Sequence, residues 1–294
     1  MTNSDLKGIY SALLSSINED GSLNEAGLRQ IIRHNIDKMK IDGLYVGGSS
    51  GENFLMDTDM KKKIFDIAKD EVGNQVKLIA QVGGTNVYES MDLAQYATNL
   101  GYDAISAVTP FYYQYSFEEI KEYYQMIVDS CDNRLLIYSV PSLTGVNINV
   151  GDFKELFKIK NIIGVKFTAP DFFLLERLRK ACPDVLIFSG FDEMLLPAVV
   201  NGVDGAIGST FNVNGKNARK IFDLAKSNKI EEARKTQHET NDLIEAILEN
   251  GLYPTLKELL KLEGVNAGFN RRPMASADHS QVENAKTIYK NLLK

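Results

Sequence analysis

Residues 162–166 read Ile-Ile-Gly-Val-Lys, an apolar run that ends in a lysine and continues directly into Phe167 and Thr168. A short apolar run of this kind predicts a buried strand. Seven similar runs alternate with longer segments of helical period, at residues 9–14, 43–46, 78–82, 104–108, 135–139, 185–189 and 205–207. This alternation is typical of parallel strands joined by crossover helices. The sequence therefore predicts an α/β fold, an eight-stranded parallel β/α (TIM) barrel, with a doubly wound sheet as the lesser alternative.

Helices are expected between these strands, and several of the segments begin with Ser, Asp or Asn, which are good N-caps. The expected helices span residues 24–39, 57–72, 86–100, 116–131, 150–159, 171–181, 193–201 and 215–227. Residues 229–294 continue with a helical pattern that is interrupted at Gly251, at residues 264–268 and at Pro273. No Ser/Gly-rich linker precedes them. We therefore expect a catalytic barrel over residues 1–228 and a C-terminal helical extension over residues 229–294, packed on the barrel or on a neighbouring subunit.

Composition and charge exclude several classes of protein. The 294 residues carry a formal net charge of -6, and no block of Lys and Arg suggests a nucleic-acid surface; the Arg271-Arg272 pair is expected to be solvated. Two cysteines, a polar start and no long apolar run predict a soluble, cytoplasmic protein with no membrane span. The histidines at positions 34, 238 and 279 have no Cys or His at ligand spacing, so no metal is expected.

Lys166 is the first candidate for chemistry, because a lysine at the end of a buried strand loses part of its hydration. Desolvation disfavours the ammonium, so the pKa of the side chain falls toward neutrality and the free amine becomes a nucleophile. Such an amine can form a Schiff base with a ketone. The structural alternative is a lysine that reaches out to solvent or pairs with a carboxylate.

Further candidates follow the strands, where the carboxyl ends of a barrel place its active site. The segment Gly47–Glu52 is rich in glycine but lacks the Gly-Lys-Ser/Thr ending of a nucleotide-binding loop. Its two hydroxyls, Ser49 and Ser50, could hold a small carboxylate together with backbone N–H groups. A tight turn before a capped helix would also contain these residue types.

Tyr138 ends the strand that precedes Lys166, so in a barrel the two side chains could meet above the core. We expect Tyr138 to carry a proton, with its phenolate stabilised by a neighbouring ammonium or Schiff-base cation. A core tyrosine with a satisfied hydroxyl is the alternative. Asp192 and Glu193 could bind the hydroxyls of a polyol, hold a metal or cap the next helix. Capping is the default for residues at this place, and the polyol is favoured over the metal because no third carboxylate or histidine is near them in sequence.

Three motifs closely resemble the N-acetylneuraminate lyase and dihydrodipicolinate synthase superfamily, over essentially the whole chain. They are Gly48-Ser49-Ser50-Gly51-Glu52, Tyr138-x-Val140-Pro141 and Gly164-Val165-Lys166. Segments 44–49, 106–113, 190–193 and 205–210 look like the sialic acid lyase branch. The synthase branch usually has an arginine where this chain has Leu143, and a glutamate where it has Phe167. The chain departs from the lyases after the first strand, with Ser15-Ser16-Ile17 in place of their common Thr-Pro-Phe.

The resemblance implies a role for each matching position. Lys166 would be the Schiff-base nucleophile, and Tyr138 would accept the proton of the substrate's C4 hydroxyl. Ser49 and Ser50 would hold the substrate carboxylate. The sugar's hydroxyl tail would contact Thr168, Gly190, Asp192, Glu193 and Ser209. Tyr253 would approach the N-acyl end. Members are usually homotetramers, and Tyr112 matches a tyrosine donated across a subunit interface.

The same resemblance implies a class I (Schiff-base) aldolase that cleaves N-acetylneuraminate, a sialic acid, reversibly. The products would be pyruvate and N-acetyl-D-mannosamine, and neither a metal nor an organic cofactor would be needed. Another pyruvate-dependent aldolase, acting on a 2-keto-3-deoxy sugar acid, would use identical imine chemistry. A non-catalytic keto-acid sensor on the same barrel is the third hypothesis, because a fold alone does not fix function.

Overall fold

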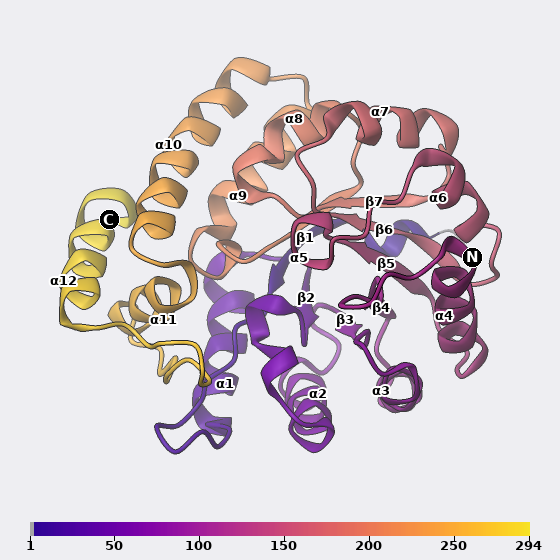
Figure 1. The fold of residues 1–294 in the computed structure, drawn as a ribbon. Helices are drawn as coiled ribbons and strands as arrows, with labels where there is room; N and C mark the ends of the chain where they lie inside the picture. The colour runs from indigo at the N-terminus through magenta and orange to yellow at the C-terminus, as the bar shows by residue number, and fades with distance from the viewer. Residues whose placement is uncertain (1–2) are drawn as a thin grey trace.

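The computed structural model of the chain describes residues 3–294, and a closed barrel of eight parallel strands forms its centre (Figure 1). Each strand pairs with the next in the chain, and β8 returns to β1 with Ala206 opposite Ile9. The predicted TIM barrel is therefore confirmed, and the doubly wound sheet is excluded. The strands are β1 (Gly8–Ala12), β2 (Gly43–Val46), β3 (Lys77–Gln81), β4 (Ala104–Val108), β5 (Leu135–Ser139), β6 (Ile162–Phe167), β7 (Leu186–Ser189) and β8 (Gly205–Gly208).

Helices surround the barrel and continue beyond it. They are α1 (Glu25–His34), α2 (Thr58–Val72), α3 (Val87–Asn99), α4 (Phe117–Asp129), α5 (Pro141–Thr144), α6 (Val150–Leu156), α7 (Phe172–Ala181), α8 (Leu195–Val200), α9 (Phe211–Lys226), α10 (Ile230–Glu249), α11 (Leu252–Leu262) and α12 (His279–Ile288). Predicted caps are confirmed at Asp57, Asn86 and Ser116, whose side chains each accept a backbone N–H of the first turn. These three helices therefore begin where their N-cap residues indicate.

The helical segments that differ most from the prediction are α9 and α5. Helix α9 begins at Phe211, four residues early, because residues 211–214 form a separate turn joined across a kink at Asn214, where φ is -128°. The short helix α5 follows β5 directly and begins at Pro141, a residue that suits the first helical turn. Neither segment has the apolar period that predicts a helix from sequence.

Side chains alternate along each strand between the barrel interior and the layer under the helices. Interior residues from strands that do not pair meet directly: the rings of Tyr10 on β1 and Phe188 on β7 lie 5.6 Å apart, edge to face. The interior cluster includes Tyr10, Ala12, Tyr45, Ile79, Ala104, Val108, Leu136, Tyr138, Leu186, Phe188 and Ile207. The alternation matters for function, because it points Tyr138 into the barrel from β5, and Lys166 lies opposite it on β6.

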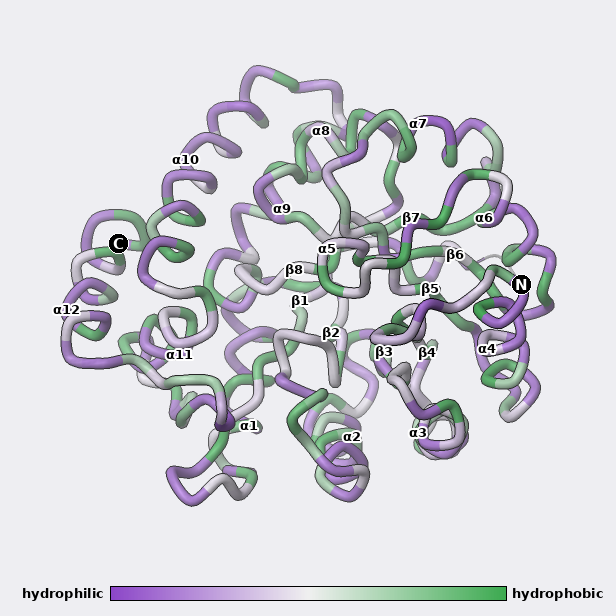
Figure 2. Tube along the Cα trace, in the orientation of Figure 1, coloured by the Kyte–Doolittle hydropathy of each residue, from purple (hydrophilic) through white to green (hydrophobic). Residues whose placement is uncertain are grey.

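The C-terminal helices lie side by side along one flank of the barrel, with α10 packed on α9 and α11 packed on both α10 and α12 (Figure 1). Helix α10 is mostly hydrophilic, as expected for an outer helix (Figure 2). The predicted interruptions are confirmed, because Gly251, Gly264 and Pro273 all lie between helices. Across residues 3–294, no helix is both long enough and apolar enough to span a membrane.

Candidate active site

Lys166 lies inside the barrel near the carboxyl end of β6, with only 5 % of its surface exposed. Its Nζ atom lies 4.1 Å from the ring centre of Tyr138 and 4.2 Å from that of Tyr45. Among the residues that the structure describes, Nζ has no ion-pair or hydrogen-bond partner. Burial lowers the pKa of Lys166 to about 7, although the charge of Asp192 acts in the opposite direction. The predicted desolvated amine is confirmed, and Lys166 neither reaches solvent nor pairs with a carboxylate.

Tyr45 forms the second wall around this amine, and sequence reasoning missed it. Its hydroxyl donates to Ser106 Oγ at 3.0 Å, and Ser106 Oγ donates to the Leu136 carbonyl at 2.9 Å. The rings of Tyr45 and Tyr138 meet edge to face at 6.0 Å, an arrangement that contributes about 0.5–1.5 kcal/mol beyond area burial. Tyr45 thus holds a fixed ring face toward Nζ. Tyr45 lies on an expected strand, two residues before Gly47, and this inward position is the sequence signal that could have identified it.

Tyr138 lies opposite Lys166 in the strand register and its hydroxyl lies 3.5 Å from Ser49 Oγ. Burial raises the pKa of Tyr138, and the contact with Ser49 lowers it. The unmodified Lys166 amine does not offset this rise. The reason is that an amine with a pKa near neutrality carries little positive charge at the pH where a phenol ionises. Stabilisation of the phenolate by a Schiff-base cation stays a prediction.

The glycine-rich segment after β2 brings its hydroxyls into the barrel mouth. Gly47 has φ of 75°, in the region that favours glycine, and the chain then forms a 3₁₀ turn over Ser49–Gly51. Ser50 Oγ lies 2.6 Å from Ser209 Oγ, which follows β8. Ser49 faces Tyr138 as described above. The structure therefore brings together Ser49, Ser50, Ser209 and Tyr138 from three separate loops and strands.

Asp192 is buried beyond the end of β7, and its carboxylate bonds across to the residues after β8. Its Oδ2 atom accepts from the Thr210 backbone N–H at 2.8 Å and from the Thr210 hydroxyl at 2.6 Å. Burial raises the pKa of Asp192 to about 6, against these two hydrogen bonds. A side chain at Gly208 would place its Cβ 2.1 Å from Asp192 Oδ1. Asp192 therefore does not cap the following helix, which was one of the predicted alternatives.

The neighbouring positions complete this side of the mouth. Thr168 is buried and its Oγ1 has no hydrogen-bond partner among residues 3–294. A Cβ at Gly190 would lie 1.9 Å from that same Oγ1, so only glycine fits there. The Glu193 carbonyl accepts from Asn241 Nδ2 at 3.1 Å, on α10. In the described part of the chain, no three His, Cys, Asp or Glu side chains are grouped to hold a metal, so the metal alternative for Asp192 and Glu193 lacks a third ligand.

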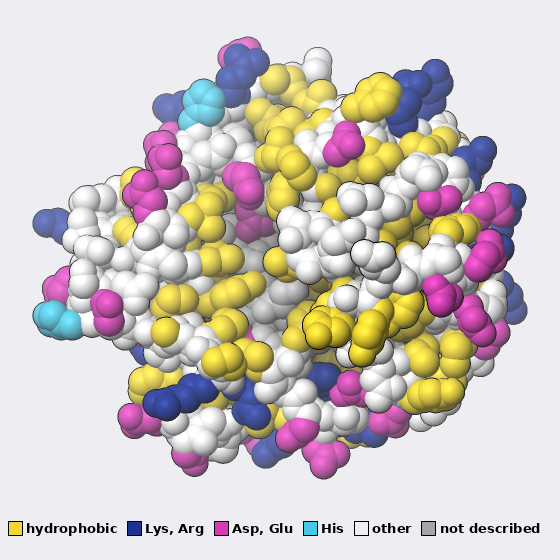
Figure 3. Space-filling view, viewed as in Figure 1, with side chains coloured by type: hydrophobic (Ala, Val, Ile, Leu, Met, Phe, Trp, Pro, Cys, Tyr) yellow, Lys and Arg dark blue, Asp and Glu magenta, His cyan; other side chains and the backbone are white. Residues whose placement is uncertain are grey.

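A cavity of about 320 Å³ connects Ser49 to Tyr253, the residue expected near the N-acyl end. Its lining is Ser49, Glu52, Phe54, Leu55, Val108, Phe111, Val140, Leu143, Thr144, Tyr253 and Met274. Burial raises the pKa of Tyr253 to about 12. Figure 3 shows that this face of the molecule is hollowed near its centre, with hydrophobic side chains gathered around the hollow. A mostly apolar wall therefore lies beside the polar groups of the barrel mouth.

Tyr112 lies outside this cavity and is 84 % exposed, with its ring 5.1 Å from that of Tyr113. Its φ of 81° is unusual for a residue with a side chain. Within one chain, the structure does not bring Tyr112 to the site. An exposed aromatic pair of this kind is typical of a subunit interface.

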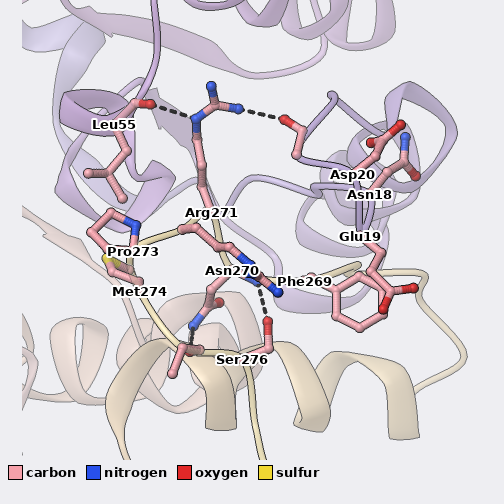
Figure 4. Close-up of a pocket in the computed structure, with 13 residues that line it drawn as sticks. Asn18, Glu19, Asp20, Leu55, Phe269, Asn270, Arg271, Pro273, Met274 and Ser276 are labelled. Atoms are coloured by element: carbon pink, nitrogen blue, oxygen red, sulfur yellow. Dashed lines mark hydrogen bonds between the residues drawn. The ribbon is translucent and has the colours of Figure 1, made fainter.

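A larger cavity, of about 1040 Å³, lies between residues 18–21 and residues 269–276 (Figure 4). At its edge, Arg271 Nε donates to the Leu55 carbonyl and Arg271 Nη1 donates to the Gly21 carbonyl, each at 2.5 Å. The expectation that Arg271 is solvated is therefore wrong. The guanidinium instead joins the C-terminal segment to the loops after β1 and β2.

Comparisons with known proteins agree with this geometry. The model of the dihydrodipicolinate synthetase family matches residues 5–292. The N-acetylneuraminate lyase of Fusobacterium nucleatum is 63 % identical over 289 residues, 98 % of this chain and 100 % of that protein. A crystal structure of N-acetylneuraminate lyase from Fusobacterium nucleatum complexed with pyruvate superposes with a TM-score of 0.96, at 61 % identity, covering 100 % of this chain and 99 % of that one. The CdNal protein of Clostridium difficile, crystallised with mannosamine, gives a TM-score of 0.97 at 63 % identity, covering 98 % and 99 % of the two chains. The chain therefore belongs to the dihydrodipicolinate synthetase family, and within that family it groups with the N-acetylneuraminate lyases.

Proposed function

We propose that the protein is a class I aldolase that cleaves N-acetylneuraminate reversibly to pyruvate and N-acetyl-D-mannosamine. The observation that carries the proposal is the Lys166 amine, buried without a partner and in register with Tyr138. The relatives named above support the choice of substrate, since the Fusobacterium enzyme was crystallised with pyruvate and the Clostridium protein with mannosamine. An amine of lowered pKa is what imine chemistry at neutral pH requires.

The mechanism follows from these side chains. Lys166 Nζ adds to the C2 ketone of the open-chain sugar acid, and loss of water leaves a cationic imine. The electrons of the C3–C4 bond move into this imine as the bond breaks, and the C4 hydroxyl gives its proton to Tyr138. Before this step the cationic imine lowers the pKa of Tyr138, which the neutral amine does not, so the phenol releases its own proton to water and accepts the C4 proton as a phenolate. Protonation at C3 and hydrolysis of the enamine then release pyruvate.

The remaining site residues bind the substrate in this proposal. Ser49 and Ser50 hold the carboxylate with hydroxyl donors. The hydroxyl tail lies along Thr168, Gly190, Asp192, Glu193 and Ser209, and Tyr253 meets the N-acyl end. The unpartnered Thr168 hydroxyl supports this placement, because a buried polar group normally has a partner. No metal or organic cofactor takes part in the steps written above.

We further propose that the active protein is a homotetramer in which the exposed Tyr112 reaches a neighbouring subunit. A cytoplasmic location fits the free thiols of Cys131 and Cys182. The proposed catalytic domain spans residues 1–228, of which the structure describes 3–228, and the proposed extension spans residues 229–294.

The pH dependence of imine formation tests the role of Lys166. Its ammonium must lose a proton before it attacks, so the rate of borohydride-trapped imine formation with pyruvate is expected to rise as the pH passes through about 7. The negative charge of Asp192 stabilises the Lys166 ammonium and raises the pKa of Lys166. Asp192→Asn is therefore expected to move the midpoint of imine formation to lower pH. Asp129→Asn, at the end of α4, is the control and leaves the midpoint unchanged. A midpoint near the ordinary lysine value of 10.5 contradicts the proposal.

Substrate length tests the choice of reaction. Pyruvate release is measured from N-acetylneuraminate and from a six-carbon 2-keto-3-deoxy sugar acid at equal concentrations. The polar groups at Thr168, Asp192 and Ser209 are expected to favour the longer acid, because remote contacts raise the rate at the reacting centre. Faster release from the shorter acid would assign the protein to the other aldolase class. Saturable binding of both acids without release would indicate the sensor.

A further inference from the structure

A buried ion pair joins the glycine-rich loop to the C-terminal extension. Lys257 Nζ, on α11, lies 2.5 Å from Glu52 Oε1, and the two side chains are 2 % and 0 % exposed. Lys257 Nζ also donates to the Phe269 carbonyl at 2.6 Å. No residue of this pair has a role in the steps proposed above, although Glu52 lines the 320 Å³ cavity.

The Glu52 carboxylate also accepts hydrogen bonds from donors in two other segments. Its Oε1 atom accepts from the Ser15 hydroxyl at 3.2 Å, after β1. Its Oε2 atom accepts from the Arg271 backbone N–H at 2.5 Å. Figure 4 shows Arg271 on the C-terminal segment, with its guanidinium bonded to Leu55, close to Glu52 in sequence. One carboxylate therefore joins the loops after β1 and β2 to α11 and to the segment near residue 270.

The backbone of Glu52 connects these contacts to Ser49 and Ser50, whose hydroxyls are proposed to bind the substrate carboxylate. Glu52 has φ of 59°, a backbone conformation that residues other than glycine rarely adopt. The surrounding contacts must therefore stabilise it. Its N–H donates to the Ser49 carbonyl at 3.0 Å, which closes the 3₁₀ turn over Ser49–Gly51. Ser49 Oγ in turn lies 3.5 Å from the Tyr138 hydroxyl. A shift of Glu52 would therefore move Ser49 and Ser50 relative to Lys166.

Helix α11, which carries Lys257, also contributes a residue to the lining of the 320 Å³ cavity. Tyr253 lies one turn before Lys257 on α11 and lines the cavity beside Ser49. Anchoring α11 through Lys257 thus fixes the turn that holds Tyr253. A buried ion pair is a weak source of stability, because desolvation of two charges offsets their attraction. A role in positioning accounts better for its retention beside the barrel mouth.

We propose that Glu52 and Lys257 are positioning residues that hold the Ser49–Ser50 turn against α11. Through this contact the C-terminal extension sets the affinity of the site for the keto-acid carboxylate. The inference rests on the proposed function, because it assigns Ser49 and Ser50 to that carboxylate. Neither residue touches the reacting atoms in this account. The imine chemistry of Lys166 itself is unchanged.

The test compares Lys257→Met, the double variant Glu52→Gln/Lys257→Met and the control Lys261→Met. Lys261 lies on the same helix, is partly exposed and pairs with Glu258, so the control removes a lysine from α11 and leaves both members of the buried pair in place. Thermal unfolding shows which variants are folded. The double variant is included because Lys257→Met alone leaves a buried unpaired carboxylate, whereas the double variant leaves none.

The readout is the pyruvate concentration that gives half-maximal trapping of the imine, together with the two KM values of the condensation reaction. Both buried-pair variants are expected to raise the pyruvate values by about tenfold or more, since a misplacement of about 1 Å can cost about 10²-fold. The KM for N-acetylmannosamine is expected to rise less than the pyruvate values, because the Asp192 side of the mouth keeps its contacts and only Tyr253, at the N-acyl end, depends on α11. Lys261→Met is expected to match wild type throughout.

Two results would overturn the inference. One is a folded double variant with the wild-type pyruvate concentration dependence. The other is an equal rise in both KM values, which indicates a general loosening of the barrel. Failure of wild type to trap any pyruvate is a different result, because it overturns the proposed function itself.

Discussion

Lys166→Ala is expected to abolish cleavage of N-acetylneuraminate, with turnover falling on the order of 10⁴-fold or more, as for removal of a covalent nucleophile. The reason is geometric. Nζ lies over the rings of Tyr45 and Tyr138, and no other lysine within residues 3–294 lies over either ring. Pyruvate release by the purified variant measures the loss, with circular dichroism to confirm that the barrel is folded.

Lys226→Ala is a matched control for this variant. Lys226 is also partly buried with a lowered pKa, but it lies at the end of α9 and donates to the Val203 carbonyl, away from the barrel mouth. Its replacement is expected to leave turnover near wild type. Near-normal turnover by Lys166→Ala would show that the carbon–carbon bond is broken without an imine at this lysine.

Tyr138→Phe is expected to keep imine formation and to lose about 10²- to 10⁴-fold in cleavage, the usual contribution of a positioned proton carrier. The phenylalanine ring keeps the wall 4.1 Å from Nζ, so the amine stays desolvated. The hydroxyl that lies 3.5 Å from Ser49 Oγ is lost, and with it the acceptor for the C4 proton. Imine trapping with pyruvate and pyruvate release from N-acetylneuraminate, measured on the same preparation, separate the two steps.

Tyr10→Phe provides the comparison. Tyr10 is another buried inward tyrosine, but its hydroxyl donates to the Leu6 carbonyl, remote from Lys166. Its loss is expected to affect stability alone. Equal losses of trapping and cleavage in Tyr138→Phe would mean that the tyrosine only shapes the pocket around the amine.

The strands and the principal groups of the site could be predicted from sequence because each depends on local pattern. A short apolar run ending in Lys166 indicates both a strand and a desolvated amine. The hydroxyls at Ser49 and Ser50 follow another such run. Barrel closure then places the ends of these strands together, so a few local signals predict a shared site.

Contacts between distant segments could not be predicted in this way. Glu52 and Lys257 are 205 residues apart, and their pairing depends on how the C-terminal extension returns to the barrel. The bond from Thr210 to Asp192 likewise crosses from one strand end to the next. Arg271 looked like a solvated surface residue, because its partners are carbonyls of two loops and leave no mark in composition.

The central claim is that the substrate becomes covalently bound to Lys166. The most direct measurement is to add borohydride to the wild-type protein during turnover of N-acetylneuraminate and to map the modified residue by peptide mass spectrometry. We expect one reduced pyruvyl group per chain, on Lys166, and none in Lys166→Ala. Pyruvate release without any adduct, or an adduct on a different lysine, would contradict it.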